Sequence, residues 1–313
     1  MAAMFPSLML LLGSSATGWD LRAVPSCDTA EFQRLVAPMA VAARLTYTST
    51  AGSSYENPSD ANATVPGFVR SGIKHDPAAG GMRALVFADE SSGRLLLAFR
   101  GTDLDNTTVS GAADACANLV LFEEARRREL PSSCDRFDPS TLDYFARSVA
   151  FARQVEGAFA PTGLQLLITG HSLGAALAVL VAAGLNADPG RATAVPVLAF
   201  AEPPVAQALR RRTQARNLPL GSAYVLADAH DPVQRAAIRA GVVGTPCTWA
   251  AGDAPPSCAA CDFATGRRSS GCVECILATH TLKHYLSLIR GPRPTCESAI
   301  DGGSTNTGGA PSC

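Results

Sequence analysis

The sequence predicts an α/β fold: a mostly parallel central sheet with helices on both faces, plus a Cys-rich loop insertion. Short apolar segments alternate with longer segments of helical periodicity, as in βαβ units. The strand candidates are continuous apolar runs, which is typical of parallel strands that are buried on both faces. Hydrophobic residues make up 47% of the 313 residues and charged residues 17%, a composition that favours a packed core.

The first part of the chain is expected to form a helix, a loop and the first two strands of the sheet. Residues 30–47 have apolar side chains at helical spacing, and Pro38 should kink or split that helix. Residues 48–81 are rich in Ser, Gly, Asn and Pro, which favours loops with short edge structure. Two apolar runs, 82–89 and 94–99, flank a turn and predict two strands.

Further along, strands and helices alternate. The expected helices are 141–159, 172–185 and 205–216, and the expected strands are 164–169, 195–200 and 223–226. Residues 244–276 interrupt this alternation with Cys, Pro, Gly and Ser, and predict a stapled insertion. We therefore expect one domain over residues 19–296, followed by a flexible tail at 297–313.

The amino terminus predicts secretion. Residues 1–18 resemble a signal peptide, because an apolar stretch is followed by small residues, with cleavage after Gly18 or Ala16. Sequons at Asn62 and Asn106 are candidate glycosylation sites in the same compartment. We therefore expect a protein that is secreted or lies in the lumen of the secretory pathway.

Charge and hydropathy argue against a nucleic-acid partner and against a transmembrane segment. The formal net charge is −1, with 26 basic and 27 acidic residues, so no nucleic acid is expected as a partner. The longest apolar run, 173–185, is shorter than the roughly 20 residues that a membrane span requires. No transmembrane segment is expected.

The chain has ten cysteines, an even number that predicts disulfides in a secreted protein. Two C-x-x-C motifs are formed by Cys258 with Cys261 and by Cys272 with Cys275. In an oxidising compartment these thiols should form disulfides, and the alternative is a zinc site with four thiolate ligands.

The strongest chemical motif is Gly170-His171-Ser172-Leu173-Gly174, between an apolar strand and an apolar helix. A nucleophile elbow needs glycines on both sides of the serine, because the strand-to-helix turn leaves no room for side chains there. The helix that follows points its first amides at a developing oxyanion. Ser172 is therefore the predicted nucleophile.

This elbow resembles that of the class 3, fungal-type lipases, a family with an α/β-hydrolase fold. The resemblance extends over residues 29–290 and includes Leu-Leu-Leu-Ala-Phe-Arg-Gly-Thr at 95–102, which is similar to the family's oxyanion strand. It implies that the backbone N–H groups of Thr102 and Leu173 form the oxyanion hole, with the hydroxyl of Thr102 as a further candidate donor.

In this fold the acid follows the nucleophile and the base comes last. Asp231, followed by Pro and Val, is similar to the family's acid segment, whereas the rival Asp228 lies outside that motif. Among five histidines, His280 fits the family's C-terminal pattern, with Tyr285 five residues later. His284 is the alternative base.

Residues 118–130 begin with an apolar run and continue with Glu and Arg at i,i+4 spacing. The family places a lid between the oxyanion strand and the elbow, so the resemblance makes this segment a lid candidate. The alternative is an ordinary surface helix packed on the domain. The lid candidates are Leu119, Val120, Leu121 and Phe122.

Together these motifs imply a carboxylic ester hydrolase that acts through an acyl-enzyme on Ser172 and needs no cofactor. The expected substrates are acyl lipids at a lipid–water interface, with triacylglycerol first, and phospholipase A1, galactolipase and feruloyl-type esterase activities as alternatives. A non-catalytic lipid-binding protein is the alternative from another class, and a further interpretation makes 244–276 a partner-binding module. The resemblance also implies a disulfide between Cys27 and Cys296.

Overall fold

The computed structural model describes residues 19–26, 28–47, 64–76, 81–104, 107–122, 130–213, 222–240, 242–250, 252–259, 261 and 270–297. The predicted signal peptide, Cys27, both sequon asparagines and most of the predicted tail lie outside the described residues.

Within the described residues, eight strands form one sheet in the order β1-β2-β3-β4-β5-β6-β7-β8. They are β1 (Val69–His75), β2 (Ala84–Asp89), β3 (Arg94–Phe99), β4 (Gln165–His171), β5 (Val197–Phe200), β6 (Ala223–Asp228), β7 (Thr245–Trp249) and β8 (Thr295–Cys296). Strands β3 to β7 are parallel, while β1, β2 and β8 join the sheet in antiparallel pairs. The expected mostly parallel sheet is confirmed.

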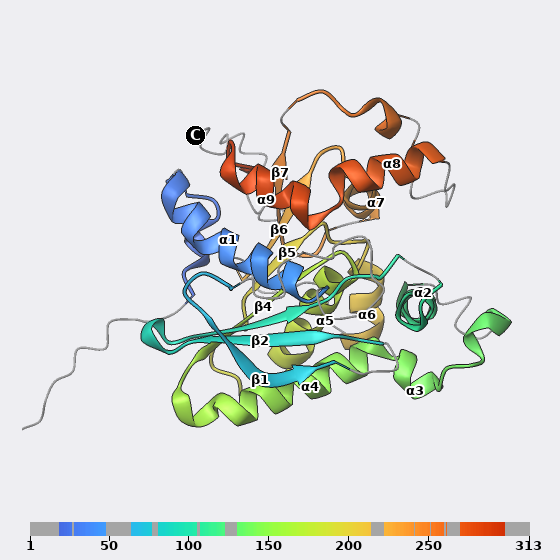
Figure 1. The fold of residues 1–313 in the computed structure, drawn as a ribbon. Helices are drawn as coiled ribbons and strands as arrows, with labels where there is room; N and C mark the ends of the chain where they lie inside the picture. Colours follow the sequence, from blue (N-terminus) through green and yellow to red (C-terminus); the bar gives the residue numbers. More distant parts are fainter. Residues whose placement is uncertain are drawn as a thin grey trace, which may run out of the picture.

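Helices cover both faces of this sheet (Figure 1). They are α1 (Thr29–Leu45), α2 (Val109–Phe122), α3 (Pro139–Leu142), α4 (Tyr144–Phe159), α5 (Leu173–Asn186), α6 (Ala206–Thr213), α7 (Pro232–Ala240), α8 (Ser270–Thr279) and α9 (Leu282–Arg290). Helices α1 and α9 pack together on one face, and α2, α4, α5 and α6 contribute to the core of the other.

The two cores follow the alternation of side chains along each strand. In β3, Leu95 and Leu97 pack in the core that contains α5, whereas Leu96 and Ala98 pack in the core that contains α1. Because both faces of the parallel strands are covered, their sequences are apolar throughout, as the sequence patterns predicted.

Two segments differ from the sequence-based expectation. Helix α1 is not split at Pro38 but runs through it as one helix, with Asp28 accepting hydrogen bonds from the N–H groups of Ala30 and Glu31 at its start. Strand β7 lies within the segment that was predicted to be a Cys-rich loop. Its burial alternates and its backbone pairs with β6, so the irregular part of that segment begins after β7.

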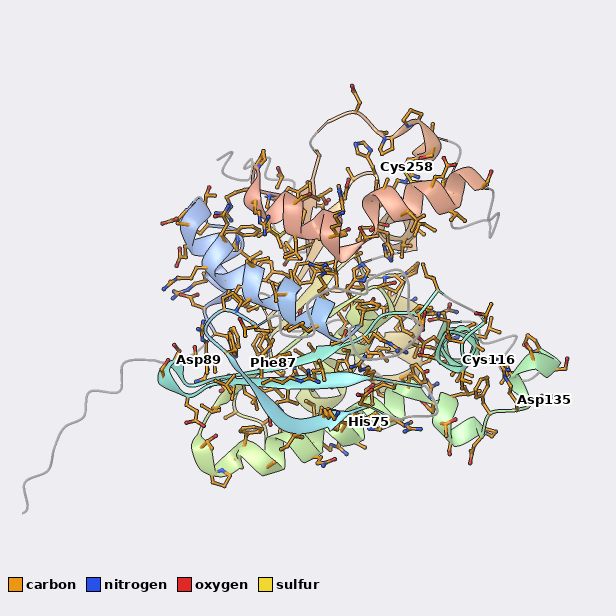
Figure 2. The ribbon with its side chains drawn as sticks, in the orientation of Figure 1. His75, Phe87, Asp89, Cys116, Asp135 and Cys258 are labelled. Carbon is orange, nitrogen blue, oxygen red and sulfur yellow. A yellow bond between two sulfur atoms is a disulfide. The ribbon has the colours of Figure 1, made fainter. Side chains whose placement is uncertain are left out.

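Four disulfides are present among the described residues (Figure 2). They join Cys116 to Cys134, Cys247 to Cys296, Cys258 to Cys275 and Cys261 to Cys272. The two C-x-x-C motifs are thus bonded to each other as disulfides, and the cysteines of the zinc alternative are all paired. The described residues contain no cluster of His, Cys, Asp or Glu that fits a metal ion.

The predicted disulfide between Cys27 and Cys296 is wrong. Antiparallel pairing of β8 with β7 places Cys296 directly opposite Cys247, and the two are bonded. This strand pairing joins segments far apart in the chain, so no local sequence pattern indicates it.

Candidate active site

Ser172 lies on the sharp turn between β4 and α5. Its backbone has φ 57° and ψ −126°, a strained conformation for a residue other than glycine. Its side chain is partly exposed, whereas His171 and Leu173 on either side are buried. The turn therefore presents the hydroxyl of Ser172 at the carboxyl end of β4, as in a nucleophile elbow.

Close backbone approach explains the two glycines of the motif. A Cβ at Gly170 would overlap with the carbonyl group of Gly174, and a Cβ at Gly174 would overlap with the carbonyl oxygen of Phe99. The first turn of α5 thus lies directly against the end of β3. As the first residue of α5, Leu173 has no helical acceptor for its N–H, which leaves that donor free for an oxyanion.

Asp231 and His280 form a buried couple. Nδ1 of His280 is 2.8 Å from Oδ2 of Asp231, and the two residues are 7% and 0% exposed. The phenol of Tyr285 donates a second hydrogen bond to Oδ2 of Asp231 at 2.9 Å. Burial and the nearby carboxylate of Asp231 raise the pKa of Tyr285 well above its usual range, so the phenol stays protonated and remains a donor.

The local sequence positions Asp231. Its Oδ1 accepts hydrogen bonds from the N–H groups of Val233 at 2.9 Å and Gln234 at 3.4 Å, in the first turn of α7. Asp at the N-cap followed by Pro232 at the first helical position is a favoured way to begin a helix. One oxygen of the carboxylate therefore caps α7, and the other faces His280.

The rival residues pair with each other. Oδ2 of Asp228 is 2.5 Å from Nε2 of His284, and Oδ1 of Asp228 accepts a hydrogen bond from the N–H of His230 at 2.7 Å. The structure thus brings Asp231 together with His280, and Asp228 together with His284.

His171 connects the elbow to His280. The pKa of His171 is lowered to about 3, mainly by burial and also by His280, so the imidazole is neutral. Its Nε2 lies 2.5 Å from the carbonyl oxygen of His280 and must be the donor, which leaves Nδ1 to accept a hydrogen bond from Tyr47 at 2.9 Å. This contact holds His280 beside the turn that carries Ser172.

Thr102 follows β3 and lies next to the elbow. A Cβ at Gly101 would meet the side chain of Ser172 at 3.1 Å, so this backbone runs alongside the nucleophile. The side-chain amide of Asn118 on α2 donates to Oγ1 of Thr102 at 3.0 Å. The segment of Thr102 therefore lies beside Ser172 in space, and Leu173 follows Ser172 directly in the chain.

A second side chain of α2 holds the same segment. Asp114 accepts hydrogen bonds from Arg100 at 2.8 Å, from the N–H of Asp103 at 2.7 Å and from the phenol of Tyr144 at 2.7 Å. Burial raises the pKa of Asp114 to about 6, although the guanidinium of Arg100 opposes this shift. The carboxylate fixes the chain on both sides of Gly101 and Thr102.

Sequence reasoning missed Asp114 and Asn118. Together with Ser110 they recur every four residues in an otherwise apolar helix, a spacing that places them on one helix face. This periodicity was the available signal.

The lid candidates form the last turn of α2. Leu121 is 2% exposed and packs in the larger core, while Val120 packs near the Cys116–Cys134 disulfide. Arg211 of α6 donates to the carbonyl oxygens of Leu121 and Phe122 at 3.1 and 3.4 Å. This turn is thus anchored to the domain, and residues 123–129 of the predicted lid lie outside the described residues.

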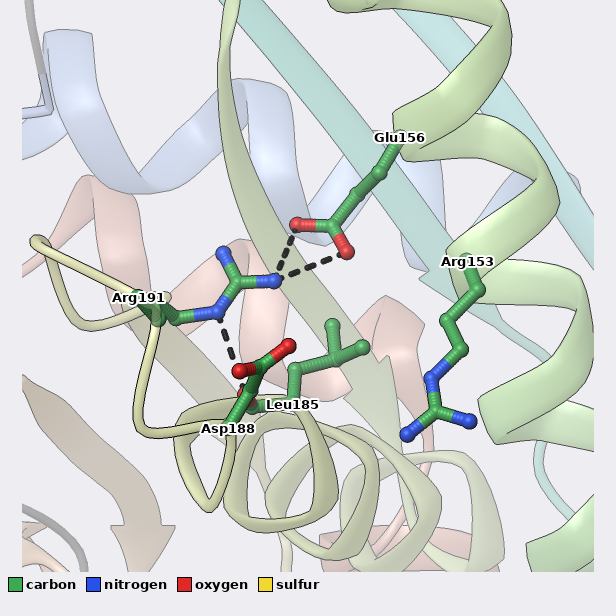
Figure 3. Close-up of a pocket in the computed structure, with 5 residues that line it drawn as sticks. All are labelled: Arg153, Glu156, Leu185, Asp188 and Arg191. Atoms are coloured by element: carbon green, nitrogen blue, oxygen red, sulfur yellow. Dashed lines mark hydrogen bonds and ion pairs between the residues drawn. The ribbon is translucent and has the colours of Figure 1, made fainter.

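One pocket lies away from these residues. It is lined by Arg153, Glu156, Leu185, Asp188 and Arg191 (Figure 3). It adjoins the end of α5 distant from Ser172, about 20 Å along that helix. Its main contact is the ion pair between Arg191 and Glu156 at 2.8 Å, so it is not part of the candidate active site.

No helix among the described residues is long and apolar enough to cross a membrane.

Comparison with known proteins finds a family match over part of the chain that carries this site. The model for class 3 lipases matches residues 97–239, a range that contains Thr102, Ser172 and Asp231 but not His280. No curated protein matches the sequence.

Solved structures give distant similarities. Lipase II from Rhizopus niveus is 14% identical with a TM-score of 0.44, over 72% of this chain and 83% of that one. A triacylglyceride lipase from Rhizomucor miehei is 15% identical with a TM-score of 0.44, over 71% and 81% of the two chains. By the family match, residues 97–239 of this chain are similar to the class 3 lipases.

Proposed function

We propose that this protein is a secreted serine hydrolase that cleaves carboxylic esters of acyl lipids, with triacylglycerol as the first candidate substrate. The observation that carries the proposal is the buried Asp231–His280 couple beside the strained turn of Ser172. The pairing follows the chain order expected for this fold, nucleophile, acid and then base.

In this mechanism Oγ of Ser172 attacks the ester carbonyl while Nε2 of His280 takes the hydroxyl proton. Asp231 holds the imidazole through Nδ1 and stabilises its charged form. The tetrahedral oxyanion is stabilised by the backbone N–H groups of Thr102 and Leu173, each worth about 2.7–4 kcal/mol by analogy with a deleted donor.

Collapse of the intermediate gives an acyl-enzyme and an alcohol that takes the proton from His280. Water activated by His280 then hydrolyses the acyl-enzyme and releases the fatty acid. No cofactor enters these steps.

Exposed apolar side chains support a lipid substrate. Four large hydrophobic residues that are at least 42% exposed lie within seven positions of a candidate catalytic residue. They are Leu104 and Val109, which follow Thr102, and Val273 and Leu277, which precede His280. We infer that these side chains lie at the rim of the active site, where exposed apolar groups favour contact with a lipid surface.

If the last turn of α2 acts as a lid, only its exposed side chains can contact the substrate, because Leu121 is buried in the core. Leu119 and Phe122 remain partly exposed and are the side chains that such a lid would use. The disulfides among the described residues support an oxidising compartment and so a secreted protein.

The test compares wild type with Ser172→Ala on emulsified long-chain triacylglycerol. Fatty-acid release by wild type alone supports a triacylglycerol lipase. Release only from phospholipid, galactolipid or feruloyl esters would assign the substrate to that class, and the proposed serine hydrolase mechanism would stand. If neither protein acts on any ester and a fluorophosphonate does not label folded wild type, the non-catalytic lipid-binding protein replaces this proposal.

A further inference from the structure

Two neighbouring residues of α9 form hydrogen bonds with the loop that carries Asp231. Tyr285 donates to Oδ2 of Asp231 at 2.9 Å and accepts a hydrogen bond from the N–H of Asp228 at 3.1 Å. His284, one position earlier, contacts Oδ2 of Asp228 at 2.5 Å. Two Asp–His couples, Asp231–His280 and Asp228–His284, therefore lie side by side and share Tyr285 between them.

Asp228 also shapes the turn that leads to Asp231. Its Oδ1 accepts the N–H of His230 at 2.7 Å, and its carbonyl oxygen accepts the N–H of Asp231 at 3.1 Å. The carboxylate of Asp228 is thus shared between this turn and His284. Whatever moves that carboxylate also moves the backbone from which Asp231 projects.

His284 is placed by the start of α9. Thr281 caps this helix and accepts a hydrogen bond from the N–H of His284 at 3.3 Å. The same short connection, between α8 and α9, carries His280. The side chain of His284 is 24% exposed, and that of Asp228 is 7% exposed. A short hydrogen bond to a carboxylate fixes the relative orientation of its two partners. Because the side chains of His284 and Asp228 are polar and His284 is partly exposed, their contact adds little to the hydrophobic core.

We propose that His284 and Asp228 are positioning residues for the reaction: their contact holds the loop of Asp231 against α9, so that Asp231 and His280 keep their relative orientation. This inference rests on the proposed function, in which Asp231 and His280 are the acid and base. Loss of the contact leaves Asp228 without its side-chain partner, and the turn from Asp228 to Asp231 loosens.

The test measures turnover of a soluble short-chain ester, together with the melting temperature. For His284→Ala we expect kcat to fall about 10- to 100-fold, in the range that a misplacement of about 1 Å costs, with KM almost unchanged. Lys283→Ala, at an exposed position in the same turn of α9, is the matched control and should keep the wild-type kcat.

A pair of amide variants separates positioning from folding. In His284→Gln the side-chain N–H still reaches Asp228, whereas the side chain of His284→Asn is too short. We expect Gln to restore most of the wild-type kcat and Asn to behave like Ala, at similar melting temperatures. This comparison also stands if His284→Ala does not fold.

Equal kcat for the Gln and Asn variants, or a wild-type kcat for folded His284→Ala, would overturn the inference. In both of these cases wild type still turns over the ester and the proposed function survives. If wild type itself neither turns over an ester nor reacts with a fluorophosphonate, it is the proposed function that fails, and the role inferred for His284 fails with it.

Discussion

Asp114 and Asn118 lie one helical turn apart on α2, and both bind the segment that carries Thr102. Asp114 holds Arg100 and the N–H of Asp103, while Asn118 holds the hydroxyl of Thr102. One face of α2 therefore positions the proposed oxyanion donor, and the last turn of the same helix contains the lid candidates. Any movement of α2 would therefore shift the backbone at Thr102.

Replacing Asp114 with Ala should destabilise the fold. The side chains of Arg100 and Asp114 are 3% and 1% exposed, and removing one partner leaves a buried charge without its counterion. We expect a loss of about 3–5 kcal/mol in the free energy of unfolding, measured by urea denaturation. Asp20→Ala, which removes an exposed ion pair with Arg22, is the control and should lose much less. Similar losses in both variants would contradict this.

Removing the amide of Asn118 should slow catalysis more than it lowers stability. Without this donor the hydroxyl of Thr102 is free to rotate, and the backbone beside Ser172 is less constrained. We expect Asn118→Ala to lower kcat on a soluble ester by about tenfold, at the lower end of what a misplaced oxyanion donor costs. Thr102→Val removes the same hydrogen bond, so the double variant should be no slower than the slower single variant. Additive losses would indicate independent roles.

Glu202 should make stability depend on pH. Burial raises the pKa of Glu202 well above its usual value of 4.5, although the N–H of Val243 opposes the shift. The folded state therefore holds the proton more tightly than the unfolded state. Its contribution to stability is complete below pH 4.5 and is lost as the pH rises through the folded-state pKa, at about 1.4 kcal/mol per pKa unit of elevation.

Glu202→Gln keeps the shape of the side chain and removes this titration. We expect its melting temperature to exceed that of wild type at alkaline pH, with a difference that shrinks as the pH approaches 4.5. Glu90→Gln, at an exposed position, is the control and should show no gain that grows with pH. A constant difference between Glu202→Gln and wild type at every pH would count against a buried, protonated Glu202.

Gly174→Ala should disturb the elbow through packing. The new methyl group would overlap with the carbonyl oxygen of Phe99, which is backbone and cannot rotate away. We expect a loss of about 1–3 kcal/mol in the free energy of unfolding, together with loss of activity. Gly157→Ala on α4, where no atom lies within 4 Å of the new Cβ, is the matched control. It should be more stable than wild type by about 0.5–1 kcal/mol. A change in the free energy of unfolding of the same sign in both variants would contradict this prediction.

Val273→Ser with Leu277→Ser should affect emulsions selectively. The two side chains are 43% and 42% exposed on α8, which leads into His280. If they contact the lipid surface, activity on emulsified triacylglycerol should fall roughly 10- to 100-fold, because two apolar side chains lose their burial on binding. Activity on a dissolved ester should be unchanged. Val69→Ser is the control, because Val69 is 76% exposed but pairs with Ala88 near the amino end of β3, away from Ser172. Equal losses on both substrates would remove the lipid-contact role.

Several features could be predicted from the sequence because their causes are local. The glycines around Ser172 reflect backbone contacts within one turn, and Asp231 followed by Pro232 is a helix start that can be recognised from neighbouring residues alone. The alternation of apolar strands and amphipathic helices predicted the parallel sheet for the same reason. Side-chain periodicity depends only on the conformation of the segment that carries it.

Other features depended on how distant segments meet. Cys296 is bonded to Cys247 rather than Cys27 because β8 pairs with β7, and Leu121 belongs to the core because α2 packs against the rest of the domain. Likewise, two aspartates three residues apart and two histidines four residues apart can be matched in more than one way by spacing alone. Only the tertiary structure, which sets the approach of α9 to the end of β6, decided that Asp231 meets His280 and Asp228 meets His284.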